Sequence, residues 1–291
     1  MQDILQKMKK PKHQQTIRIP KAILYTAKTL ETLSPGLATK FAIKLFTTPI
    51  RHKLPKREIE MDTHSKQQLL KIESLNKKVM LYQYGASSKK ILLVHGWSGR
   101  GTQLVKIADE LLKLGYSTVS YDAPGHGKAP GKTSNMSEFI AAALQIEKEF
   151  GPFEYAIGHS LGGMTVLNAM KRGLNVKKAV IIGSGDVVED ILNDFVLKLK
   201  LKPYIAQRMK SNFENRLGET MNSYSAYIAA KEVSVPVLVV HDENDDDVPV
   251  SAAHHIYKHL EKGQLLITKE LGHRKILGDS KVIKKIVEFI S

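Results

Sequence analysis

The sequence predicts an α/β fold, in which a mostly parallel β-sheet carries helices on both faces. From about residue 56 onwards, short β-rich segments alternate with stretches of helical periodicity, as expected when helices connect parallel strands. Several of the β-rich segments are uninterrupted apolar runs, which is typical of strands buried on both faces. The chain has 291 residues, of which 42% are hydrophobic, so it is long enough to bury a large core.

The expected elements follow one another in a regular order. Three strands form an antiparallel lead-in and six more form the parallel sheet: 58–61, 69–72 and 78–84, then 91–94, 117–121, 155–158, 179–182, 236–240 and 265–268. Apolar residues at helical spacing predict the intervening helices at 102–114, 136–150, 160–172, 250–262 and 280–290. Residues 186–234 have helical spacing and no convincing strand. We interpret them as a small helical cap inserted over one end of the sheet.

Composition excludes several classes of function. The chain has no cysteine, so disulfides, thiolate metal sites and cysteine nucleophiles are ruled out. The first ten residues contain no apolar segment of the kind found in secretory signals, and no apolar run approaches the ~18 residues needed to span a bilayer. We therefore expect a cytoplasmic protein. The surplus of basic residues has no interleaved aromatics or recognisable motif, so nucleic-acid binding is not expected.

Positive charge is concentrated at the amino terminus. Residues 1–60 contain thirteen Lys and Arg but only four Asp and Glu. In residues 1–55, apolar positions such as Ile17 and Phe41 alternate with lysines such as Lys28 and Lys44, which predicts a basic amphipathic helical extension. These helices either pack on the rest of the protein with their lysines outward, or lie peripherally on an anionic membrane at its inner surface.

The segment Gly158-His159-Ser160-Leu161-Gly162 directly follows an expected strand and precedes a helix. A serine on such a sharp turn is forced toward positive φ, and its neighbours at 158 and 162 must be very small. The helix that follows directs free N–H groups and a positive dipole end toward the turn. Ser160 is therefore a candidate nucleophile, although an N-cap serine beside a flexible glycine turn is the alternative interpretation.

A glycine-rich loop, His95 to Gly101, follows the buried strand at 91–94. Ligands in open α/β sheets bind at the carboxyl ends of the strands, which is where this loop begins. The backbone N–H groups of Trp97 and Leu161 are candidate donors of an oxyanion hole. Trp97 and His159 are candidate substrate-binding residues.

Two further polar residues leave strands at the same edge. Asp245 belongs to an acidic loop after the strand at 236–240, and His273 follows the strand at 265–268. Ser160, Asp245 and His273 thus occur in the order nucleophile, acid, base that is described for one hydrolase architecture. Within the acidic loop, Asp242, Asp246 and Asp247 remain alternative candidates for the acid.

These motifs resemble the α/β-hydrolase superfamily, and the resemblance covers residues 56–291. The turn at Ser160, the His95-Gly96 loop, the segment Asp122 to Gly127, the acidic loop ending Val248-Pro249 and the Gly272-His273 loop occur in family order. The resemblance implies that Ser160 is the nucleophile, His273 the general base and Asp245 the acid, without a cofactor. The Asp122 segment is expected to shape a loop beside the site, with His126 and His159 near the pocket.

The sequence therefore predicts a serine hydrolase that cleaves carboxylic esters or thioesters through an acyl-enzyme on Ser160. A membrane-associated lipase or lysophospholipase and a cofactor-free acyltransferase would use the same residues, and a non-catalytic ligand-binding protein of this fold is a further alternative. His255 and His259 stand one helical turn apart, but Ile256 occupies the position where a metalloprotease helix has Glu. We expect these histidines on a surface helix and no metal site.

Overall fold

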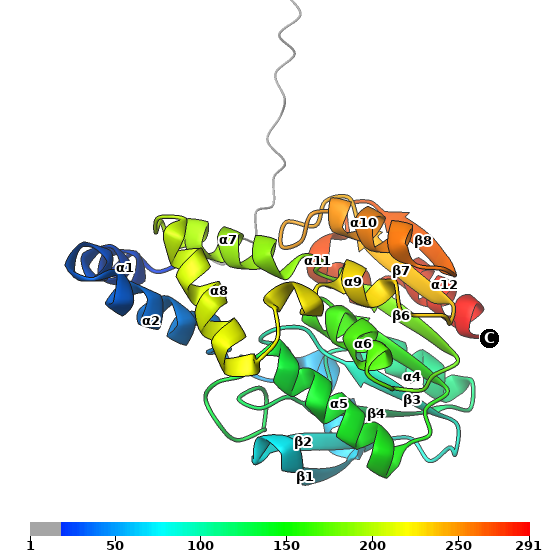
Figure 1. Ribbon diagram of the computed structural model, residues 1–291. Coiled ribbons are helices and arrows are strands. Elements are labelled where there is room, and N and C mark those ends of the chain that lie inside the picture. Colours follow the sequence, from blue (N-terminus) through cyan, green and yellow to red (C-terminus); the bar gives the residue numbers. More distant parts are fainter. Residues whose placement is uncertain (1–18) are drawn as a thin grey trace, which may run out of the picture.

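The computed structural model describes residues 19–291, so Ile17 and the rest of the first 18 residues of the expected extension lie outside it. An eight-stranded sheet crosses the centre of the molecule (Figure 1). Its strands are β1 (Lys66–Ile72), β2 (Lys77–Tyr84), β3 (Lys90–Val94), β4 (Ser117–Asp122), β5 (Tyr155–His159), β6 (Lys178–Ile182), β7 (Val237–Asp242) and β8 (Gly263–Thr268).

The strand order is β1-β2-β4-β3-β5-β6-β7-β8. β1 and β2 pair antiparallel, β2 is antiparallel to β4, and all other neighbours are parallel. The predicted α/β architecture is thereby confirmed. Because the chain moves outward from β3 to β4 and then returns to β5 on the other side, the connections diverge between β3 and β5, a position where such sheets bind ligands.

Helices cover both faces of the sheet. They are α3 (Ile59–His64), α4 (Val105–Lys113), α5 (Met136–Phe150), α6 (Leu161–Lys171), α10 (Ser251–His259), α11 (Gly272–Lys275) and α12 (Ser280–Ile290), with short 3₁₀ turns η2 (Glu73–Leu75) and η4 (Ile276–Gly278). Alternate residues of β3 point to opposite faces: Ile91 and Leu93 join a core with α4 and α12, whereas Leu92 and Val94 join a core with α5 and α6.

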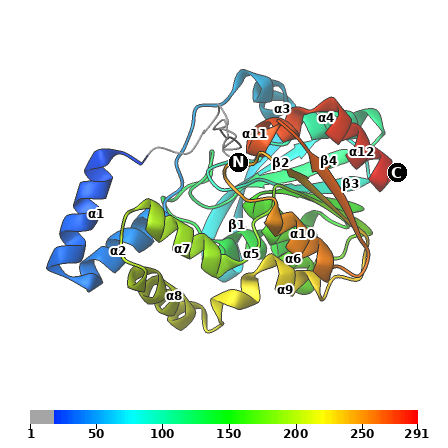
Figure 2. The same ribbon diagram turned by 90° about the horizontal axis from the view of Figure 1, so that it is seen from above.

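Four helical segments lie between β6 and β7, where the cap was expected: α7 (Val188–Lys198), α8 (Tyr204–Leu217), η3 (Met221–Tyr224) and α9 (Ala226–Ala230). Two amino-terminal helices, α1 (Lys21–Leu33) and α2 (Pro35–Phe46), pack beside them (Figures 1 and 2). The Phe46 ring contacts those of Phe195 and Phe213 at centroid distances of 5.1 and 5.9 Å. The buried Glu31 carboxylate accepts a hydrogen bond from the Lys202 amide at 2.7 Å.

The expected strand at 58–61 is wrong. These residues form the end of a 3₁₀ turn, η1 (Lys56–Glu58), and the start of helix α3. Apolar side chains two residues apart, Ile59 and Met61, suggested an alternating strand; only Met61 is buried. The acidic residues Glu60 and Asp62 lie in the first turn of the helix, where they interact favourably with its positive end.

Candidate functional site

Ser160 stands on a sharp turn between β5 and α6. Its backbone has φ 55° and ψ −120°, a left-handed conformation that is costly for a residue with a side chain. The Ser160 amide donates to the Ile182 carbonyl at 2.9 Å, which ties the turn to the end of β6. Among residues 19–291, the hydroxyl has no hydrogen-bond partner. The expected positive φ is confirmed.

Close backbone contacts explain the glycines around Ser160. A Cβ atom at Gly158 would lie 2.2 Å from the Gly162 carbonyl oxygen, and one at Gly162 would lie 2.2 Å from that of Val94. Gly96 approaches from the loop after β3, where a Cβ would lie 2.9 Å from the Ser160 Cβ. Any larger residue at these three positions would therefore displace the serine turn.

Asp245 and His273 form a hydrogen-bonded pair at the same edge of the sheet. His273 Nδ1 lies 2.7 Å from Asp245 Oδ2, and the side chains are 12% and 1% exposed. The pair lies over Gly183, the residue after β6, because a Cβ there would be 3.2 Å from His273 Nδ1 and 3.4 Å from Asp245 Oδ2. Gly183 directly follows Ile182, which holds the Ser160 amide, so three distant chain segments meet here.

The surroundings of Asp245 keep its carboxylate charged. Burial on its own would raise the pKa of this carboxyl, but the hydrogen bond and charge of His273 and the Val248 amide outweigh burial and lower it. The second oxygen, Oδ1, accepts the amides of Asp247 at 2.9 Å and Val248 at 2.8 Å. An anion at this position favours the His273 tautomer with the proton on Nδ1 and leaves Nε2 as a base.

The neighbouring acids have different positions. Asp242 Oδ1 accepts the Asn244 and Gly272 amides, and Oδ2 accepts the Leu271 amide and the Thr268 hydroxyl, all at 2.7–3.1 Å. Asp242 therefore anchors the loop that carries His273. In the described chain, neither Asp246 nor Asp247 makes a side-chain hydrogen bond to that histidine. Of these four aspartates, Asp245 is the one whose carboxylate hydrogen-bonds to the His273 imidazole within residues 19–291.

Two buried histidines surround the pair. His159 is 2% exposed and its Nε2 lies 2.9 Å from the His273 carbonyl oxygen, with the two rings 4.6 Å apart. Burial and the nearby His273 lower the pKa of His159 to about 3. His159 thus packs against His273. Its side chain is almost fully buried, so little of it is accessible for the substrate contact expected from the sequence.

His241 was not identified from the sequence. Its side chain is 1% exposed, and Nε2 lies 3.0 Å from the Val248 carbonyl oxygen and 3.5 Å from Asp245 Oδ2. Because the Val248 carbonyl can only accept a hydrogen bond, His241 must carry a proton on Nε2. The same N–H group is directed toward the Asp245 carboxylate. The sequence feature that could have identified His241 is its position as the first polar residue after the apolar residues of β7.

Leu161 directly follows Ser160, and Trp97 follows Gly96, at which a Cβ atom would lie 2.9 Å from the Ser160 Cβ. Leu161 is the first residue of α6, and within residues 19–291 neither its amide nor that of Trp97 donates to another protein group. His95 shapes the Trp97 loop: its Nε2 accepts the Ala123 amide at 3.1 Å, so Nδ1 carries the proton and donates to the Gly96 carbonyl at 2.6 Å. Both amides are thus available for an oxyanion.

Asp122 holds two loops together beside the site. It is fully buried, and it accepts hydrogen bonds from the Gly101 and Lys128 amides, both at 2.6 Å, and from the Tyr82 hydroxyl at 2.9 Å. His126 lies in the second loop and its ring stands edge-on to Trp97 at 5.0 Å. Burial lowers the pKa of His126 to about 4.

The histidines of α10 lie apart from this site. His255 Nδ1 is 2.5 Å from Asp186 Oδ2, and His259 Nδ1 is 2.8 Å from the His255 carbonyl oxygen. Within the part of the chain that the structure describes, no three His, Cys, Asp or Glu side chains gather in a way that could hold a metal ion.

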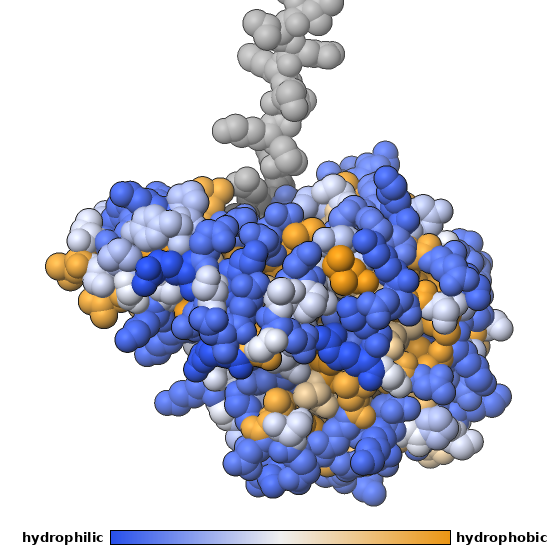
Figure 3. All heavy atoms as spheres, viewed as in Figure 1, coloured by the Kyte–Doolittle hydropathy of each residue, from blue (hydrophilic) through white to orange (hydrophobic). Residues whose placement is uncertain are grey.

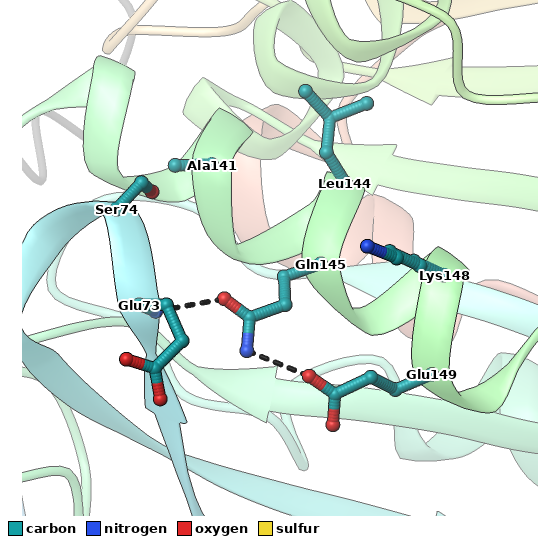
Figure 4. A pocket seen from close by; sticks show the side chains of 7 residues that line it. All are labelled: Glu73, Ser74, Ala141, Leu144, Gln145, Lys148 and Glu149. Atoms are coloured by element: carbon teal, nitrogen blue, oxygen red, sulfur yellow. Dashed lines mark hydrogen bonds between the residues drawn. The ribbon is translucent and has the colours of Figure 1, made fainter.

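Figure 4 shows a surface pocket between the β1–β2 connection and α5, where Gln145 bridges the Glu73 amide and the Glu149 carboxylate at 2.9 and 2.7 Å. A second pocket lies between α4 and α12 and is lined by charged residues such as Lys106 and Asp109. None of the residues lining either pocket belongs to the site around Ser160.

Comparisons with known proteins bear on the family and the fold of the chain. Residues 91–226 match a model described as the alpha/beta hydrolase family, and residues 219–290 match one described as TAP-like protein. The lysophosphatidylserine lipase ABHD12 of Danio rerio is 25% identical over 190 residues, which are 60% of this chain and 48% of that protein. The chain thus aligns with about half the length of this curated relative.

Solved structures with the same fold include an esterase from Pyrococcus furiosus, with a TM-score of 0.63, 16% identity and coverage of 84% of this chain and 97% of that one. A bacterial membrane phospholipase A has a TM-score of 0.61 and 16% identity, with coverage of 93% and 98%. These solved structures share the fold of the chain, and the two family models, which together span residues 91–290, show that the chain belongs to the α/β-hydrolase superfamily of enzymes.

Proposed function

We propose that this enzyme is a serine hydrolase that cleaves carboxylic esters or thioesters through an acyl-enzyme on Ser160. The observation that carries the proposal is the Asp245–His273 pair, whose 2.7 Å hydrogen bond lies at the end of β6 next to the strained serine turn. The Ser160 hydroxyl, the Asp245 carboxylate and the His273 imidazole follow one another along the chain in the order nucleophile, acid, base and have the composition of a nucleophilic triad.

In this mechanism Ser160 Oγ attacks the substrate carbonyl while His273 Nε2 accepts its proton. The C–O or C–S bond to the leaving group then breaks, and His273 returns the proton to that group. Water attacks the acyl-serine with the same assistance and releases the carboxylic acid. Asp245 fixes the Nδ1–H tautomer throughout. The Trp97 and Leu161 amides stabilise the oxyanion, and contacts between base and nucleophile shorten when substrate binds.

A fluorophosphonate probe tests the nucleophile, because it reacts covalently with activated serines. We expect labelling at Ser160 and its loss in Ser160→Ala, with a fall in kcat of about 10³-fold or more for p-nitrophenyl esters. Ser184→Ala is a matched control, since Ser184 is buried at the end of the neighbouring strand and bonds the Gly185 carbonyl. Labelling that persists in folded Ser160→Ala would refute the assignment.

The same experiment separates the alternatives. A non-catalytic ligand-binding protein would fold but not react with the probe. An acyltransferase would react at Ser160, but would transfer the acyl group to an added alcohol or thiol in preference to water. We favour hydrolysis of esters with an apolar acyl chain, because Trp97 and the cap offer apolar side chains and the Danio rerio relative is named as a lipase. A series of acyl-chain lengths tests this choice.

We further propose that residues 1–55 attach the enzyme to an anionic membrane. Tyr25, Leu33 and Leu37 on α1 and α2 are 72%, 71% and 47% exposed, and apolar surface is visible at this end of the molecule in Figure 3. Lys21, Lys28, Lys40 and Lys44 are also exposed on these two helices. No helix within residues 19–291 has the length and apolar character to cross a bilayer, so the contact proposed is peripheral.

Co-sedimentation with vesicles that contain phosphatidylglycerol tests this attachment. We expect binding that weakens with salt, and that is reduced when Tyr25, Leu33 and Leu37 are all replaced by Ser. Leu69→Ser with Leu114→Ser is the control, because both residues are about half exposed and lie outside α1 and α2. Equal binding of the two variants, or indifference to lipid charge, would contradict the proposal.

A further inference from the structure

The segment 47–58, here called the clamp segment, connects α2 to the sheet domain and crosses the loops beside Ser160. The Ile50 amide donates to Ser98 Oγ at 2.9 Å. The Arg51 guanidinium donates to three carbonyl oxygens of the loop after β4, those of Gly125 at 3.0 Å, Ala129 at 2.5 Å and Gly131 at 3.1 Å. One arginine thus fixes the shape of a whole turn.

Both of these contacts border Trp97. Ser98 directly follows Trp97 and has φ 56°, a strained conformation that needs outside support. His126 lies within the loop that Arg51 holds, and its ring packs edge-on against the Trp97 indole at 5.0 Å. Ile50 therefore holds the backbone next to the indole, and Arg51 holds the surface on which the indole rests.

The far end of the Trp97 loop is tied to the clamp segment as well. Glu58 is 2% exposed. Its Oε2 accepts the Thr102 hydroxyl at 2.8 Å and lies 3.5 Å from Arg100 Nε. The loop is consequently held at Ser98 and at Thr102 by residues that precede the sheet. The family models that match this chain begin at residue 91, so these contacts come from outside the matched region.

We propose that Arg51 is a positioning residue, which holds Trp97 so that its backbone N–H points at the oxyanion. This inference rests on the proposed hydrolase function. Arg51 acts only through the loop carbonyls and touches neither the substrate nor the reacting atoms. Because an oxyanion donor works only within a narrow range of distance, and loss of a donor costs about 10²–10³-fold in kcat, a displaced Trp97 amide should lower kcat with little effect on KM.

The test compares Arg51→Ala and Arg51→Lys with wild type on p-nitrophenyl butyrate. We expect Arg51→Ala to lower kcat about 10- to 100-fold with KM changed by less than about twofold, and added guanidinium ion to restore part of the loss. Arg51→Lys should be intermediate, because an ammonium cannot reach three carbonyls with the fixed fork of a guanidinium. Arg208→Ala, at an exposed position on α8, should match wild type. Unchanged kcat in Arg51→Ala would refute the inference.

Trp97 is the only tryptophan in the chain, so its fluorescence reports on the clamp without any turnover. In folded Arg51→Ala we expect stronger quenching by acrylamide and a shifted emission maximum, also in a Ser160→Ala background. A kcat loss with unchanged Trp97 fluorescence would indicate a merely general destabilisation and would overturn the inference. If Ser160→Ala kept its activity, the proposed function would fail, whereas the fluorescence result would still decide whether Arg51 positions Trp97.

Discussion

Within residues 19–291, two histidines form a hydrogen bond with an aspartate, and the two pairs have different surroundings. His273 and Asp245 are 2.7 Å apart, and His255 and Asp186 are 2.5 Å apart. In both pairs the carboxylate is buried. The His273 side chain is 12% exposed, however, whereas that of His255 is 42% exposed.

The carboxylates have shifted pKa values of opposite direction. Burial raises the pKa of Asp186, and the hydrogen bonds from His255 and the Tyr227 amide do not compensate. For Asp245, the interactions with His273 and the amides of its own loop exceed the effect of burial, and the pKa falls. A contact between histidine and aspartate is therefore not sufficient to define a site. What distinguishes the first pair is a carboxylate stabilised as an anion next to a serine turn.

The comparison predicts the largest effect at Asp245. In Asp245→Asn the amide cannot stabilise a protonated His273 and favours the wrong tautomer, so kcat should fall about 10³- to 10⁴-fold at pH 7, with the fold retained. Steady-state kinetics on p-nitrophenyl esters measure this loss. Asp246→Asn is the matched control: it is adjacent and exposed, and it should keep wild-type kcat. If Asp246→Asn lost most of its kcat and Asp245→Asn did not, the assignment of Asp245 as the acid would be wrong.

The sequence alone did not decide which aspartate of the acidic loop is the acid. The parallel strands and the edge that carries Ser160, Asp245 and His273 could be predicted, because a side chain that leaves the carboxyl end of a parallel strand must lie at that edge. Within the acidic loop, however, the direction of each side chain depends on the turn itself. The Asp245 carboxylate accepts the amides two and three residues ahead, an arrangement that alternation and composition do not encode.

Contacts between residues far apart in the sequence could not be predicted from it either. Arg51 contacts carbonyls that lie 74 to 80 residues away, and nothing in its local sequence separates it from the other basic residues of the extension. His159 was expected to bind substrate, but its side chain is 2% exposed. Its burial beneath His273 follows from the loop after β8, which ends above it. Both features depend on tertiary packing and not on local periodicity.

The buried histidines should make the stability of the fold depend on pH. An unfolded histidine takes up a proton near pH 6.5, but in the folded chain His159 does so only near 3 and His126 near 4. Below pH 6.5 the unfolded state binds more protons, so acidification destabilises the fold. At pH 5.5 each of these two residues should lower the free energy of unfolding by about 1.4 kcal/mol. The pKa values of His95 and His241 are also lowered and act in the same direction.

Urea denaturation at pH 7.5 and 5.5 measures this loss. The same difference is expected in His255→Ala, because this substitution leaves His159 and His126 in place. Equal free energies of unfolding at the two pH values would show that the buried histidines titrate normally and that the contrast between the buried and exposed rings is wrong.

The smallest effect is expected at the second pair. His255→Ala removes a partner whose side chain is 42% exposed, and such pairs contribute about 0–1 kcal/mol to stability. Asp186 retains the Tyr227 amide at 2.9 Å, so the cap should stay in place and kcat should remain within about twofold of wild type. A tenfold loss of kcat would mean that this contact transmits the cap position to the site, and the two pairs could no longer be treated as independent.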